Sequence, residues 1–106
     1  MGMWRHAFRM QLKPGMLDAY RAAHDTIWPE LVDLLHESGI SDYSIFHDAD
    51  SNALFAILTI AGEDRRADLP SHPVMKRWWA EMAPLMETQP DNKPCEWSLT
   101  QVFHLA

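Results

Sequence analysis

An α+β fold of the β-α-β-β-α-β type is predicted by three features of the 106-residue sequence. Both ends of the chain alternate apolar and polar residues, which is the period of a strand. Two internal segments repeat apolar residues every three or four positions, which is the period of a helix. Between them lie two segments rich in β-branched and aromatic residues, joined by a short polar loop. This order is typical of a ferredoxin-like sandwich, in which both helices cover one face of a four-stranded antiparallel sheet.

The first strand is predicted over residues 3–12. One face of this strand carries alternate residues, namely Trp4, His6, Phe8, Met10 and Leu12. Lys-Pro-Gly at 13–15 is a turn signal, and a helix follows from about Met16 to Ser38, with Gly39 as its stop signal. Pro29 falls inside this helix, where we expect it to bend the axis.

The second and third strands are predicted over residues 42–48 and 53–61, with a polar hairpin loop between them. The next segment is interrupted at Pro70 and Pro73, and a second helix is expected from about Val74 to Met86. Residues 88–94, "TQPDNKP", have the composition of an extended linker, and the alternating residues 96–105 are expected to close the sheet. Residues 1–106 are therefore expected to form a single domain, since this length allows one modest core.

The sheet face that the helices leave uncovered is expected to be apolar, with residues such as Phe8 or Phe55 on it. A small sheet with two apolar faces needs a partner to remove the second face from water. We therefore expect a homodimer in which two sheets pack face to face, a dimeric α+β barrel.

Composition and charge exclude several classes of function. The net charge is −6 with scattered Lys and Arg, so nucleic acid is not an expected partner. Cys95 is the one cysteine, which excludes an internal disulfide and suits a reducing cytosol. Residues 1–20 lack the pattern of a signal peptide, and no segment approaches the roughly 18 apolar residues that span a bilayer. A cytoplasmic protein without a membrane partner is expected.

The familiar catalytic signatures are missing from the sequence. It contains no GxSxG elbow, no glycine-rich phosphate loop and no HExxH, and its six histidines never pair four residues apart. No metal site is therefore expected. What remains is His24, which lies on the apolar face of the first helix one turn after Tyr20. His24 is either a half-buried histidine bonded to a backbone carbonyl or a group that exchanges protons near neutral pH.

The aromatic residues also allow two interpretations. Trp78 and Trp79 are adjacent, so on a helix their side chains diverge by about 100° and do not share one narrow stripe. Either one ring is in the core and the other at a subunit contact, or an indole stacks against the C–H face of a sugar. Tyr43 is likewise either a residue at the sheet rim or a hydroxyl donor to a ligand.

Taken together, "MQLKPGMLDAYRAAHDTIWPEL", "YSIF", "KRWWAEM" and "QPDNKP…QVFHL" resemble the L-rhamnose mutarotase family over essentially the whole chain. The resemblance implies a cytosolic homodimer of the α+β barrel type that interconverts the α and β pyranose anomers of L-rhamnose without metal or cofactor. By position, His24 matches the proton-donating histidine of the family. The sugar-binding residues of the family match Tyr20, Tyr43, Trp78 and Trp79.

Four positions depart from the family pattern, and they bear on the sugar accepted rather than on the reaction class. Arg66 stands where tryptophan is frequent, and Phe46 where a second tyrosine is common. Gln101 and His104 replace the usual glutamate and tyrosine of the last strand.

Mutarotation removes a proton from the anomeric hydroxyl and delivers one to the ring oxygen, so one positioned acid and one base suffice. We expect His24 to be the acid, opposite Tyr20, a water or a further carboxylate. Two competing hypotheses are a small monooxygenase of the dimeric barrel class, cofactor-free or haem-binding, and a sugar-binding dimer without catalysis.

Overall fold

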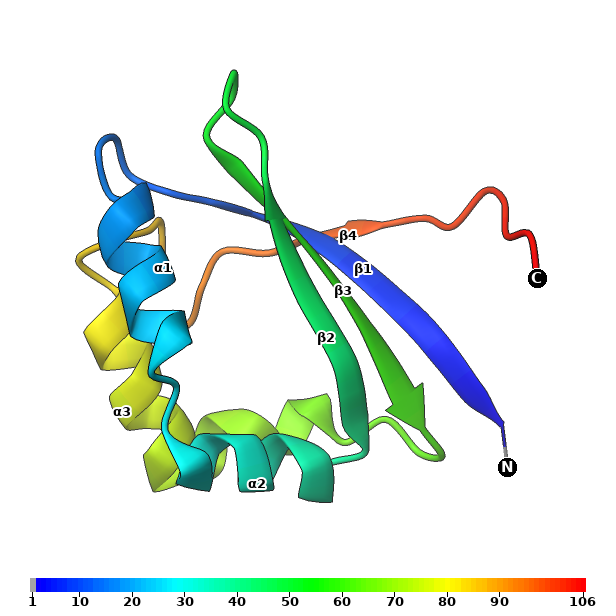
Figure 1. Cartoon of the computed structure of the whole chain (residues 1–106). Coiled ribbons are helices and arrows are strands. Elements are labelled where there is room, and N and C mark those ends of the chain that lie inside the picture. The colour runs from blue at the N-terminus through cyan, green and yellow to red at the C-terminus, as the bar shows by residue number, and fades with distance from the viewer. Residues whose placement is uncertain (1) are drawn as a thin grey trace.

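The computed structural model describes residues 2–106 and contains one four-stranded antiparallel sheet with helices packed on one face (Figure 1). Its elements in chain order are β1 (Met3–Gln11), α1 (Leu17–Asp25), α2 (Pro29–Glu37), β2 (Ile40–His47), β3 (Ala53–Ala61), η1 (Arg66–Ser71), α3 (Pro73–Met82) and β4 (Trp97–Leu99). The strand order is β2-β3-β1-β4. The predicted ferredoxin-like α+β class is confirmed. No helix within these residues is long and apolar enough to cross a membrane.

The helix predicted over residues 16–38 is two helices, so the expected bend at Pro29 is a complete break. Pro29 disfavours helical backbone at the preceding residue, and Trp28 has φ −64° and ψ 130°. Pro29 then becomes the first residue of α2, where its missing N–H costs nothing. The stop at Gly39 is confirmed: its φ is +84°, and a Cβ there would lie 2.8 Å from the carbonyl oxygen of Ala61.

Two predicted boundaries near the C-terminus are also wrong. Helix α3 ends at Met82 instead of Met86, because Pro84 interferes with a continuing helix. The strand predicted over residues 96–105 is realised only as Trp97–Leu99. Strand β4 pairs with β1 alone, and beyond Leu99 the chain leaves that neighbour and runs past the sheet as an exposed segment (Figure 1).

The inner face of the sheet forms the floor of the core. Phe8 and Met10 of β1 are both 3% exposed and pair with Ala56 and Leu54 of β3. Against them pack buried residues of the helices, namely Tyr20, Leu31, Met75, Trp78 and Met82. The expectation that Phe8 lies on the uncovered face is therefore wrong.

The outer face is nevertheless apolar, as expected, and it carries Phe55. Phe55 pairs with Arg9 on one side and Phe46 on the other, while Arg9 pairs with Trp97 of β4. The guanidinium of Arg9 lies 4.2 Å from the centre of the Trp97 ring. Large apolar side chains on this face remain exposed, namely Phe46, Ile57, Trp97 and Leu99.

Candidate active site

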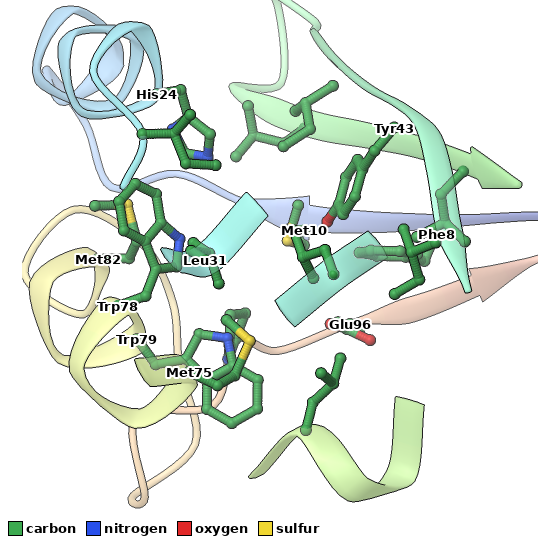
Figure 2. Close-up of a pocket in the computed structure, with 18 of the residues that line it drawn as sticks. Phe8, Met10, His24, Leu31, Tyr43, Met75, Trp78, Trp79, Met82 and Glu96 are labelled. Atoms are coloured by element: carbon green, nitrogen blue, oxygen red, sulfur yellow. The ribbon is translucent and has the colours of Figure 1, made fainter. Parts of the chain in front are cut away.

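A hollow of about 1120 Å³ lies between the inner face of the sheet and helices α1 and α3 (Figure 2). Small-molecule pockets range over about 300–1,000 Å³, so a monosaccharide fits with room for water. The hollow is lined by all five residues singled out in the sequence, namely Tyr20, His24, Tyr43, Trp78 and Trp79. The structure thus brings together residues that lie more than 50 positions apart in the chain.

Helix α1 fixes the orientation of the His24 imidazole. Its Nδ1 lies 2.8 Å from the carbonyl oxygen of Tyr20, one turn earlier. A carbonyl oxygen only accepts hydrogen bonds, so Nδ1 carries the hydrogen and donates it. In the neutral ring, Nε2 is then the nitrogen with a free lone pair. The rings of Tyr20 and His24 also contact each other, with centroids 4.3 Å apart.

The His24 ring is half-buried and bonded to a carbonyl, as the first interpretation expected, and it also lines the hollow. Proton exchange by this ring stays a prediction. Burial lowers the pKa of His24, and the hydrogen bond to Tyr20 and the charge of Asp25 offset only part of this shift. Burial raises the pKa of the Tyr20 phenol. At neutral pH the helix therefore presents a neutral imidazole beside a neutral phenol.

The tryptophans form the wall next to His24. Trp78 is buried, and its ring meets the His24 ring edge to face with centroids 5.2 Å apart. Trp28 supports Trp78 from outside the hollow, again edge to face at 5.1 Å. Trp79 is half-buried and also lines the hollow, so α3 places both adjacent rings beside the same cavity. Sequence reasoning missed the supporting Trp28, which lies at the break before Pro29.

A β-bulge directs Tyr43 into the hollow. The pairing of β2 with β3 shifts register between Ser41 and Ser44, and Asp42 has a φ of +48°. The extra residue lets Ile40 and Tyr43 face the same side although they are three positions apart. Tyr43 keeps 39% of its surface exposed, and this side chain lines the open hollow. Desolvation by the surrounding protein raises the pKa of its phenol.

The hollow also has charged residues that were not predicted as site residues. Lys93 and Glu96 line it from the segment before β4, and Asp64 and Arg66 line it from the segment around η1. The Arg66 guanidinium donates from Nε and Nη2 to the two Asp64 oxygens, at 2.9 and 2.8 Å. Glu96 could have been predicted from the alternation of residues 96–99, because this alternation places Glu96 on the sheet face opposite to that of Trp97.

The four departures from the family pattern lie in different places. Arg66 and Phe46 both line the hollow, although Phe46 is 59% exposed and pairs with Phe55 across the outer sheet face. Gln101 and His104 lie on the exposed C-terminal segment, where the His104 ring is 2.7 Å from Nη1 of Arg5. Of the four, Arg66 and Phe46 are therefore the positions that border the hollow of this subunit.

Comparisons with known proteins point to one family. The family model described as L-rhamnose mutarotase matches residues 5–105. The L-rhamnose mutarotase of Rhizobium leguminosarum bv. trifolii is 56% identical over 105 residues, covering 99% of each chain. That of Sinorhizobium fredii is 57% identical over 104 residues, covering 98% of this chain and 100% of its own.

Solved structures give the same result. The crystal structure of an L-rhamnose mutarotase from Formosa agariphila matches with a TM-score of 0.90 and 42% identity, over 97% of this chain and 99% of that one. A Mycobacterium tuberculosis protein matches with a TM-score of 0.57 and 18% identity, which shows a shared fold alone. The resemblance predicted from the sequence is confirmed: the chain belongs to the L-rhamnose mutarotase family.

Proposed function

We propose that this protein interconverts the α and β pyranose anomers of L-rhamnose and that His24 transfers the proton at the ring oxygen. Family membership and the names of the full-length relatives support the reaction and the sugar. The observation that carries the assignment of His24 is its geometry. Its Nδ1 is held by Tyr20, while the ring lines the hollow between a phenol and an indole.

The reaction needs only two coupled proton transfers. A base takes the proton of the anomeric hydroxyl, an acid protonates the ring oxygen, and the bond between C1 and the ring oxygen breaks. The open aldehyde turns about its C1–C2 bond, and the 5-hydroxyl adds to the other face of the carbonyl carbon. As the ring closes, the 5-hydroxyl loses its proton to the group that protonated the ring oxygen, and the carbonyl oxygen takes up a proton and becomes the new anomeric hydroxyl.

His24 suits the ring-oxygen position because it works in both directions. The imidazolium donates to the ring oxygen during opening, and the neutral Nε2 accepts the 5-hydroxyl proton during closure. Burial lowers the pKa of His24, so its imidazolium, once formed, is a stronger acid toward the ring oxygen than an ordinary histidine. The group that exchanges a proton with the anomeric oxygen is Tyr20, a water or a further carboxylate of the hollow. Trp78 and Trp79 provide apolar surfaces for the ring and for the methyl group of a 6-deoxy sugar.

Magnetisation-transfer NMR of L-rhamnose tests the proposal. The expected result is faster exchange between the two anomer signals when the protein is added at catalytic concentration. An unchanged exchange rate would overturn the mutarotase assignment. If the sugar still bound, the non-catalytic alternative would be favoured, and a titration with haem followed by absorption would test the monooxygenase alternative.

We also propose that two copies pack outer sheet face against outer sheet face. The support is the exposed apolar set on that face, namely Phe46, Ile57, Trp97 and Leu99, with exposed fractions between 39% and 59%. A monomer that exposes several large apolar side chains on one face is poorly soluble, and an isologous dimer removes them from water.

We further propose a cytoplasmic location. The single free Cys95 supports it, since a reducing compartment keeps thiols free.

A further inference from the structure

One carboxylate of the hollow lies away from the proposed proton transfer at His24. Glu96 points into the hollow from the segment before β4, across from His24 and Trp78 and on the same side as Tyr43 (Figure 2). His24 and Glu96 therefore face a bound sugar from two different sides. A group on the far side from the anomeric carbon contacts the parts of the sugar that do not react.

The backbone holds Glu96 in place on both sides. Before it, the Cys95 N–H donates to the Glu87 carbonyl at 3.1 Å, in a short hairpin closed by a bridge between Thr88 and Pro94. After it, Trp97 pairs with Arg9 in the sheet. Because side chains alternate along a strand and Trp97 is on the outer face, Glu96 is on the inner face. The carboxylate is thus carried by an anchored segment rather than by a free loop.

Glu96 is also available to a ligand. Within residues 2–106, its side chain makes no ion pair within 4.0 Å, and Arg66, a nearby cation, is paired with Asp64. Glu96 is exposed to the hollow, yet protein surrounds it closely enough that desolvation raises its pKa, with Lys93 and Arg66 lowering it in part. An ionised carboxylate that has lost part of its water is stabilised by hydrogen bonds from ligand hydroxyl groups.

We propose that Glu96 is a specificity-determining residue whose carboxylate accepts hydrogen bonds from neighbouring ring hydroxyls remote from the anomeric carbon. This inference rests on the proposed function. With C1 and the ring oxygen of L-rhamnose at His24, the opposite edge of the ring carries the hydroxyls on C3 and C4. A carboxylate has two oxygens and accepts from such a pair at once. The Tyr43 hydroxyl lies on the same side of the hollow as a second polar contact (Figure 2).

The test compares Glu96→Gln with wild type and with Glu81→Gln, an exposed glutamate of α3 outside the hollow. NMR exchange rates over a range of sugar concentrations give kcat and KM for L-rhamnose and for its 3-deoxy and 4-deoxy analogues. We expect Glu96→Gln to raise KM for L-rhamnose about tenfold or more, the scale of a weakened hydrogen bond to a charged group, with kcat nearly unchanged. Glu81→Gln should match wild type.

The analogues separate recognition from a general structural effect. A sugar lacking the hydroxyl that Glu96 binds should already bind wild type weakly, and Glu96→Gln should then raise its KM by a much smaller factor. An unchanged KM for L-rhamnose, or the same rise for all three sugars, would overturn the role of Glu96. If wild type and Glu81→Gln accelerate exchange while Glu96→Gln keeps wild-type KM, the proposed function stands and this inference fails. No exchange with wild type overturns both.

Discussion

The Nδ1 of His24 lies 2.8 Å from the carbonyl oxygen of Tyr20, one turn earlier on α1. This contact determines which imidazole nitrogen carries the hydrogen, and so leaves Nε2 free for a substrate. It also raises the pKa of His24 against the larger lowering effect of burial. One local hydrogen bond therefore sets the tautomer, the orientation and part of the acidity of the proposed catalytic group.

Replacing His24 by Gln should slow anomer exchange by about 10²-fold or more, the scale of a lost general acid or base. Glutamine still hydrogen-bonds to a sugar oxygen but transfers no proton at neutral pH. The measurement pairs NMR exchange rates with a thermal melt, and the exposed His72→Gln is the control. Wild-type exchange together with a lowered melting temperature would contradict the catalytic assignment and leave His24 with a structural role.

The pKa of His24 also predicts a pH dependence of stability. Its ordinary value is 6.5, and the folded protein lowers it. The unfolded chain then binds more protons in this window, so stability rises with pH. The contribution of neutral His24 to the free energy of unfolding should be complete above pH 6.5. It should be lost as pH falls through the lowered pKa of the folded protein. Melting temperatures of wild type and His24→Gln from pH 7.5 to 5 should therefore converge or cross on acidification, and a constant difference would contradict the prediction.

Glu96→Gln should raise the melting temperature at pH 7. The folded protein raises the pKa of Glu96 above 4.5, so its ionised form is disfavoured in the folded state. The protonated form of Glu96 is favoured instead, and its contribution to stability is complete below pH 4.5 and is lost as pH rises through the folded pKa. The gain from glutamine should shrink toward zero in melts below pH 4.5. A lower melting temperature at pH 7 would show that Glu96 stabilises the fold.

The two adjacent tryptophans should differ in their effect on stability. Trp78→Ala should destabilise by about 3–5 kcal/mol, the usual cost of truncating a buried aromatic residue. Trp79→Ala should cost less, since Trp79 is only half-buried, but both variants should weaken sugar binding. Denaturant unfolding and calorimetric titration with L-rhamnose measure the two effects, with the exposed Lys76→Ala as control. Wild-type sugar affinity in both variants would exclude a stacking role.

Light scattering at micromolar concentration should show a dimer. Ile57→Lys on the outer sheet face should shift the population toward monomer, because it places a charge in the apolar contact. Asp18→Lys, exposed on α1 on the opposite side of the sheet, should remain dimeric. A wild-type monomer would count against the face-to-face barrel.

Local sequence patterns were sufficient where the answer depends on neighbouring residues. The two-residue period of β1 placed Phe8 and Met10 on one face, and both are buried there. The four-residue spacing of Tyr20 and His24 placed them on one side of a helix. Gly39 ended the helix because a left-handed φ is nearly free of cost for glycine. Each of these signals acts within one turn or one strand.

The tertiary structure decided what depends on segments far apart in the chain. The bulge before Ser44 adds one residue to β2 relative to β3, and this extra residue turns Tyr43 toward the hollow. The bulge depends on how the two strands pair. Glu96 reaches the same hollow because Trp97 pairs with Arg9, almost 90 residues away. The sequence determined which side chains share a face within a regular strand or helix, since backbone periodicity is local. Only the register of the sheet and the packing of the helices determined which of those faces surround one cavity.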